Sequence, residues 1–181
     1  MADTETHYNL PLPTISDPVK LLVVIAPYYK DIADNLVSGA IAMLDQIGAD
    51  HEIVEVPGAL EVPTAIRIAD RQSNFDGYVA LGCVIRGETT HYETVCNDSS
   101  RALQLLGLEG LCIGNGILTV ENRKQAEVRA DPTNANKGGA AAAAALHLIA
   151  LTRKWGRPAK NVGFHSDQIL IADRETGTKK A

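Results

Sequence analysis

The residues best suited to chemistry stand together in the segment "RGETTH", residues 86–91, between an apolar run and a helical pattern. A glycine followed by hydroxyl residues at a helix start leaves backbone N–H groups unpaired, and with the helix dipole these favour an anion. The hydroxyls of Thr89 and Thr90 can add donors, whereas the carboxylate of Glu88 would repel an anion, so Glu88 can contribute only its N–H. The segment predicts a phosphate site; the simpler alternative is that Thr89 or Thr90 only caps the helix.

His91 would lie in the first turn of that helix. The positive end of the dipole disfavours imidazolium, which leaves a neutral ring that can accept a proton. A lone histidine is more often structural, and its place beside a possible anion site makes the two interpretations equally good. The other histidines lack comparable surroundings and receive no role; they are His7, His51, His147 and His165.

Two further cations are candidates. Arg129 shares a helix face with Glu121 and Gln125 at four-residue spacing, which by itself favours a solvated ion pair. Lys137 precedes Gly138 and Gly139, close to the start of a long helix, where a positive charge opposes the dipole. This local misfit suggests that Lys137 has a use.

The elements that must position these residues follow from the apolar pattern. Four short runs predict strands at 21–27, 51–57, 77–85 and 111–118, the first, third and fourth apolar enough to be covered on both faces. Between and after them, helical patterns occupy 31–48, 60–72, 89–107, 120–130 and 140–155, with Gly48 and Gly107 as terminators and Thr119 as a cap. This alternation predicts a flavodoxin-like, four-stranded parallel sheet with helices on both faces, a three-layer α/β/α domain.

Ligands of open parallel sheets bind beyond the carboxyl ends of the strands. The segments expected there are "PYYKD", "PGALE", "RGETTH" and "GNGILT". Their polar and aromatic residues would converge on one edge of the sheet. From the residues alone we predict a phosphate-binding flavodoxin-like domain spanning residues 21–157, preceded by an extended arm (1–20) and followed by a tail (158–181).

Composition restricts the class of protein. Aromatic residues are only 4% of the 181, so the core must be aliphatic, and a net charge of −5 argues against a nucleic-acid surface. The basic cluster "RKWGR" at 153–157 is typical of a solvated helix end. No segment reaches the ~18 apolar residues of a membrane span, and no signal peptide is evident. Three cysteines without metal-type spacing indicate buried thiols in the cytoplasm.

Longer motifs carry a resemblance. "VPGALEVP", "GCVIRGETTHYETVCNDSSRAL", "GILTVENRKQAEVRA" and "NKGG" occur in an order and spacing that resemble the lumazine synthase family, from about Lys20 to Trp155. The resemblance implies condensation of 5-amino-6-ribitylaminouracil with 3,4-dihydroxy-2-butanone 4-phosphate to 6,7-dimethyl-8-ribityllumazine, in riboflavin biosynthesis. It implies no metal or organic cofactor and a homopentamer whose sites lie between adjacent subunits.

The resemblance also implies a role for each matching residue. Tyr28 would stack on the pyrimidine, the turn Gly58–Glu61 (Gly58, Ala59, Leu60, Glu61) would bind the ribityl chain, and Val84 and Ile85 would offer backbone groups. Glu88, Thr89 and Arg129 match phosphate-binding positions, His91 matches the proton-transfer histidine, and Lys137 matches a substrate-side lysine. Arg129, Lys137 and the Asn115 region would come from the neighbouring subunit.

Two departures from the family pattern bear on function. Pro27 replaces a frequent arginine, and Asn115 replaces a frequent phenylalanine. They leave open a flavin- or lumazine-binding homologue with little or no turnover, although such a binder would need no proton-transfer histidine. A third alternative is a structural carrier. The linker "DPTNANKG" at 131–138 differs from the glycine-rich linker of shell-forming relatives, so we expect a free pentamer and not a hollow shell.

Overall fold

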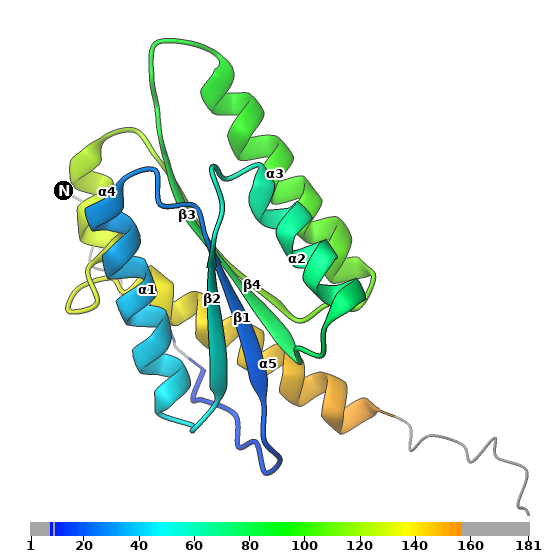
Figure 1. The fold of residues 1–181 in the computed structure, drawn as a ribbon. Coiled ribbons are helices and arrows are strands. Elements are labelled where there is room, and N and C mark those ends of the chain that lie inside the picture. Colours follow the sequence, from blue (N-terminus) through cyan, green and yellow to red (C-terminus); the bar gives the residue numbers. More distant parts are fainter. Residues whose placement is uncertain (1–7, 9, 157–181) are drawn as a thin grey trace, which may run out of the picture.

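The computed structural model describes residue 8 and residues 10–156, and it contains one parallel sheet. The strands are β1 (Lys20–Ile25), β2 (Asp50–Glu55), β3 (Gly77–Ile85) and β4 (Ile113–Val120), in the spatial order β2-β1-β3-β4 (Figure 1). Every neighbouring pair is parallel. The predicted flavodoxin-like sheet is therefore confirmed.

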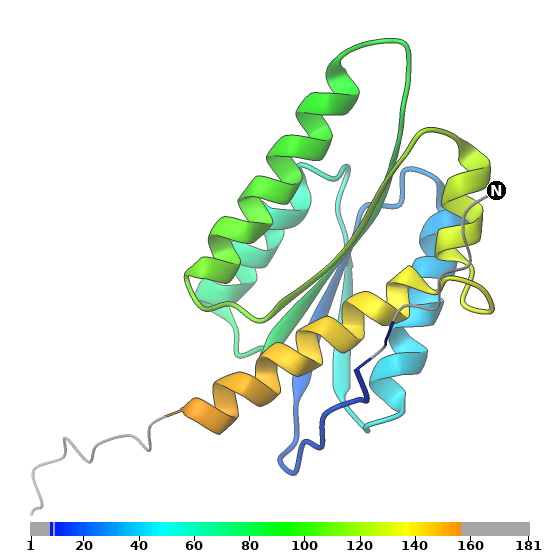
Figure 2. The ribbon, with the colours of Figure 1, turned by 180° about the vertical axis from the view of Figure 1, so that it is seen from behind.

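Five helices complete the described part of the chain. They are α1 (Lys30–Asp45), α2 (Glu61–Gln72), α3 (His91–Leu108), α4 (Arg123–Ala130) and α5 (Lys137–Trp155). Helices α1, α4 and α5 share one buried cluster with the sheet, and α2 and α3 share the other, so two helical layers enclose the strands (Figure 2). Residues 1–7, 9 and 157–181 lie outside the described residues, and they include part of the predicted arm and the whole predicted tail. Residues 10–19 of the arm contain no helix or strand.

The interior is aliphatic, as the scarcity of aromatic residues predicts. Leu21, Val23, Val79 and Leu81 on the central strands are fully buried, as is Leu146 on α5. β2 is an edge strand whose residues are exposed on both faces except the half-buried His51. β4 alternates buried residues with exposed or half-buried ones. Near-continuous burial was expected for the fourth strand, and that expectation is wrong because β4 is also an edge strand, open to solvent beside Asn115 and Thr119.

Three local predictions need correction. Thr119 lies inside β4, and the cap of α4 is Asn122, whose side-chain oxygen accepts a hydrogen bond from the N–H of Gln125 at 3.1 Å. The "GNGILT" segment is likewise the body of β4, so the strand delivers Glu121 at its end. α3 runs one residue past Gly107, and Gly110 takes the left-handed conformation, with φ of 102°.

The β1–β3 pair is where the sheet changes direction of growth, with β2 added on one side and β4 on the other. Ligands of such sheets bind outside the carboxyl ends of the strands at this point. The segments that follow β1, β2 and β3 are therefore the place to look for a site.

Candidate active site

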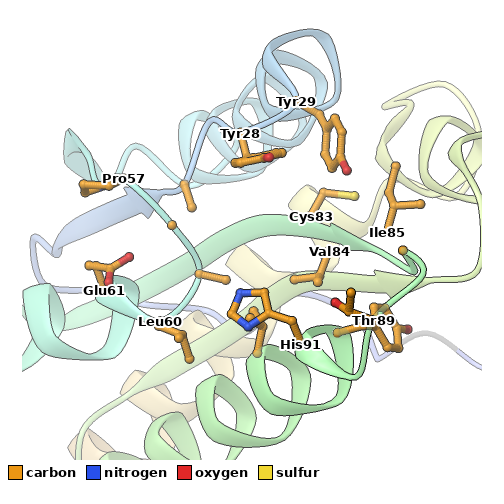
Figure 3. Close-up of a pocket in the computed structure, with 16 residues that line it drawn as sticks. Tyr28, Tyr29, Pro57, Leu60, Glu61, Cys83, Val84, Ile85, Thr89 and His91 are labelled. Carbon is orange, nitrogen blue, oxygen red and sulfur yellow. The ribbon is translucent and has the colours of Figure 1, made fainter.

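A pocket of about 440 Å³ lies at the carboxyl ends of β1, β2 and β3 (Figure 3). It is lined by nine of the predicted site residues: Tyr28, Gly58, Ala59, Leu60, Glu61, Val84, Ile85, Thr89 and His91. Segments that are far apart in the sequence thus supply one hollow.

The end of β3 offers unpaired backbone to this pocket. β1 pairs with β3 only as far as Leu81, whereas β4 continues to Ile85. The carbonyl of Leu81 accepts from Ala26 on the β1 side, and the N–H of Arg86 donates to Val120 on the β4 side. Main-chain groups of successive residues in a strand point alternately to its two sides. The main-chain groups of Cys83 and Ile85 therefore point to the side where β1 no longer pairs with β3.

An aromatic pair closes the β1 side. Tyr28 is 75% exposed, and its ring meets that of Tyr29 edge to face, with the ring centroids 5.0 Å apart. Tyr29 packs against the core, and burial, followed by the neighbouring Tyr28, raises the pKa of its hydroxyl. An exposed ring held by a partly buried neighbour is suited to stacking on a planar ligand.

The turn after β2 places a carboxylate at the start of α2. The N–H of Glu61 donates to the carbonyl of Gly58 at 3.2 Å, and the Glu61 side chain lies in the first helical turn, where the dipole favours its negative charge. A Cβ on residue 58 would come within 2.9 Å of the Glu61 carboxylate. Gly58 therefore leaves this carboxylate free to face the pocket, where it can accept hydrogen bonds from ligand hydroxyls.

The turn between β3 and α3 brings Thr89 and His91 to the pocket, while Glu88, in the same turn, does not line it. Thr90 is the N-cap residue of α3, but its side chain makes no capping hydrogen bond. The simpler alternative of a hydroxyl cap at Thr90 is therefore not what the structure has. The first N–H groups of α3 remain without a side-chain acceptor, a suitable arrangement for an anion.

Several lining residues escaped the sequence analysis. Cys83 is buried, and burial raises the pKa of its thiol to about 11, so the group stays protonated. Tyr29 and Tyr92 also line the pocket. The adjacent tyrosines after β1 were a usable signal for Tyr29, but nothing in the apolar run 77–85 distinguishes Cys83 from its neighbours.

The remaining predicted residues lie elsewhere. Asn115, Arg129 and Lys137 line a second hollow of about 380 Å³ formed by β4, α4 and the start of α5. A guanidinium N–H of Arg129 donates to the carbonyl of Gln125 at 3.1 Å, and Asn115 accepts from the N–H of Ile117 at 3.0 Å. The two hollows share no lining residue, so within one chain the structure divides the predicted residues into two groups.

The fold and the pocket define a flavodoxin-like α/β protein that binds a small molecule at the carboxyl edge of its sheet. The sequence model of the 6,7-dimethyl-8-ribityllumazine synthase family matches residues 18–153. The chain belongs to that family, and the prediction made from its motifs is confirmed.

Curated relatives agree with this assignment. A 6,7-dimethyl-8-ribityllumazine synthase of Jannaschia sp. (strain CCS1) is 60% identical over 166 residues, covering 91% of this chain and 93% of the relative. Enzymes of the same name from Novosphingobium aromaticivorans and Bartonella henselae are each 54% identical, covering 75% and 78% of this chain and 98% and 94% of the relatives. These matches support a transferase of riboflavin biosynthesis and not the non-catalytic binder.

Three further observations concern the described residues. None of the helices within them has the length and apolarity needed to cross a membrane. Across the same residues, no group of three or more His, Cys, Asp and Glu side chains is arranged to hold a metal ion. All three cysteines of the chain, Cys83, Cys96 and Cys112, are free thiols.

Proposed function

We propose that this chain condenses 5-amino-6-(D-ribitylamino)uracil with 3,4-dihydroxy-2-butanone 4-phosphate to give 6,7-dimethyl-8-ribityllumazine, phosphate and water. The observation that carries the proposal is the first pocket. It combines an exposed aromatic ring, a glycine turn with a carboxylate, and a helix start without a side-chain cap beside a histidine.

The pyrimidine substrate is proposed to occupy the β1–β2 side of the pocket. Its flat ring would stack on Tyr28 and exchange hydrogen bonds with the main-chain groups of Cys83 and Ile85. The main-chain groups of Val84 point toward β4, so the residue would contribute only its side chain, which lines the pocket. Glu61 would accept hydrogen bonds from the ribityl hydroxyls. Support comes from the exposure of Tyr28 and from the strand edge that β1 leaves unpaired beyond Leu81.

The phosphate substrate is proposed to bind at the start of α3. The N–H of Glu88 and the N–H and hydroxyl of Thr89 would hold the phosphate, which the helix dipole also favours. The exposed Glu88 side chain does not line the pocket, so its carboxylate need not face the anion. His91, on the same first turn, would transfer protons during imine formation, phosphate loss and ring closure; such positioned proton transfer typically contributes ~10²- to 10⁴-fold.

The second hollow is proposed to complete the site of an adjacent subunit. Arg129 is the phosphate-binding arginine in this proposal, and Lys137 and Asn115 form the substrate-side wall. The proposal explains why Arg129 and Lys137 line a hollow beside the open edge of β4, away from the first pocket of their own chain. A closed ring of five identical chains gives every site both halves.

The cytoplasm is the proposed compartment, because the three cysteines are free and two of them are buried. No metal or organic cofactor is required by the proposed reaction, since each step moves protons and eliminates phosphate or water.

The test is to mix purified protein with both substrates and to follow lumazine fluorescence and phosphate release, with reactions that omit each substrate in turn as controls. Equal amounts of lumazine and phosphate, formed well above the uncatalysed condensation, are expected. Tight binding of a lumazine or flavin without turnover would overturn the proposal in favour of a binding protein.

A further inference from the structure

Arg86 is the first residue of the turn that carries Glu88, Thr89 and His91, and nothing above gives it a role. Its side chain joins three segments of the chain. We propose that Arg86 is a positioning residue that holds this turn, and with it the start of α3, in the geometry that binds phosphate. The inference rests on the phosphate-binding role proposed for the turn.

The contacts of the guanidinium are specific. Its Nε donates to the carboxylate of Glu121 at 2.7 Å, and an Nη donates to the carboxylate of Glu93. The planar group also lies over the ring of Tyr92, 4.1 Å from its centroid. Glu93 and Tyr92 belong to the first turn of α3, and Glu121 follows β4, so one side chain links the end of β3 to both.

The backbone explains why the turn needs such a link. The N–H of Arg86 donates to the carbonyl of Val120 at 2.9 Å, after the last strand pair, Ile85 with Val120. Residues 87–90 belong to no strand or helix and are exposed, and a Cβ added at Gly87 would meet no heavy atom within 4 Å. In Figure 1 the turn projects beyond the other strand–helix connections.

Position, and not stability, is what this cluster is suited to provide. The side chains of Arg86, Glu93 and Glu121 are 39%, 47% and 57% exposed, and ion pairs this exposed contribute little to the free energy of unfolding. A guanidinium that contacts two carboxylates and an aromatic ring nevertheless has few alternative placements. A lysine keeps the charge but cannot reproduce this fork and stacking geometry.

The inference is tested with Arg86→Ala and Arg86→Lys. The matched control is Arg67→Ala, because Arg67 also joins two carboxylates, Asp70 and Glu109, but on α2 and at the far end of α3. The readouts are KM for each substrate, the dissociation constant of inorganic phosphate measured by calorimetry, and the melting temperature.

Arg86→Ala is expected to raise KM for the butanone phosphate and the phosphate dissociation constant by about 10-fold, within the ~10²-fold that a 1 Å misplacement can cause. KM for the pyrimidine substrate should change less than either, Arg86→Lys should recover only part of the loss, and the melting temperature should stay close to that of Arg67→Ala.

Kinetic and phosphate constants in Arg86→Ala that match those of Arg67→Ala would overturn the inference, as would equal losses for both substrates. Wild-type protein that binds no phosphate would overturn it as well. Wild-type protein that binds phosphate through an Arg86-dependent site but forms no lumazine would instead remove the proposed function and leave the positioning role supported.

Discussion

The ring of His91 lies in the pocket from the first turn of α3, and the residue is exposed. Its side chain contributes little to the core, so its loss should affect chemistry and not folding. A variant of His91 can therefore distinguish the two interpretations that the sequence left equal, a structural histidine and a proton-transfer group.

His91→Ala is expected to lower kcat, with a melting temperature close to that of the unmodified protein. Some rate should remain, because holding two substrates together already supplies much of the acceleration. The measurement is steady-state lumazine formation beside a thermal melt, with His51→Ala on β2, outside the pocket, as the comparison. A large drop in melting temperature with unchanged specific activity of the folded fraction would assign His91 a structural role.

The thiol of Cys83 is expected to be unreactive in the folded protein. With its pKa raised to about 11 by burial, the thiol is protonated at neutral pH, and only thiolates react readily. A variant that keeps Cys83 and replaces Cys96 and Cys112 by alanine should therefore react slowly with iodoacetamide at pH 8 when folded, and rapidly in urea. Fast labelling of the folded variant at pH 8 would contradict the buried, protonated thiol.

The start of α5 packs closely against α1. A Cβ on Gly138 would lie 2.0 Å from the carbonyl oxygen of Leu36 on α1, so only glycine permits this contact. The preceding Asn136 adopts the left-handed conformation, with φ of 41°, and its side chain accepts from the N–H of Gly139 at 3.0 Å. A non-glycine residue therefore supplies the left-handed backbone angle in a linker that contains no glycine before Gly138.

Gly138→Ala should destabilise the protein by about 1–3 kcal/mol, as overpacking typically does, because the clash is with backbone that cannot rotate away. Gly107→Ala is the control, since Gly107 is inside α3 and its Cβ would meet no atom within 4 Å. Alanine there should be neutral or stabilising by roughly 0.5–1 kcal/mol. Urea unfolding of both variants measures the difference, and equal midpoints would refute the close-contact explanation.

For the whole molecule, the division of candidate residues between two hollows matters most. Arg129 lies in the last turn of α4 and Lys137 is the first residue of α5, and both line the second hollow. His91 lines the first pocket. If neighbouring chains complete each other's sites, activity becomes a property of the ring.

Mixed rings test this directly. Arg129→Ala and His91→Ala rings should each be impaired, but when they are dissociated together and reassembled, about a quarter of the sites in an equal mixture would combine an intact His91 with an intact Arg129. Activity above the sum of the separate preparations is expected. Reassembled mixed rings with no gain would contradict sites shared between subunits.

The number of chains in the assembly is expected to depend on the linker between α4 and α5. The linker 131–136 is held by hydrogen bonds to Asp131 from Thr133, Asn134 and Asn136, and it contains Pro132 in place of a glycine-rich sequence. A linker restrained in this way is expected to favour the free pentamer. Light scattering should then report about five times the 19.3 kDa chain mass. A shell-sized particle or a stable monomer would each contradict it.

The class of fold could be predicted from the sequence, because alternation of apolar runs with helical periodicity leaves few arrangements open to a short chain. The run 77–85 matches β3 at both ends, since it is buried on both faces and Gly77 stands at its start. The motifs also identified the family. The turn with Thr89 and His91 could be recognised because hydroxyl residues and a histidine at a helix start indicate an anion site without any long-range information.

Which residues come into contact could not be predicted from the sequence. Cys83 reaches the pocket because β1 stops pairing at Leu81, and Arg129 and Lys137 are parted from His91 because β4 lies on the far side of β3 from β1. Arg86 likewise pairs with Glu121, thirty-five positions further along the chain. The hydroxyl of Thr90 makes no capping hydrogen bond to α3, which its residue type alone would not have predicted. Such contacts depend on strand order and on where each strand ends, which long-range packing sets and local sequence does not encode.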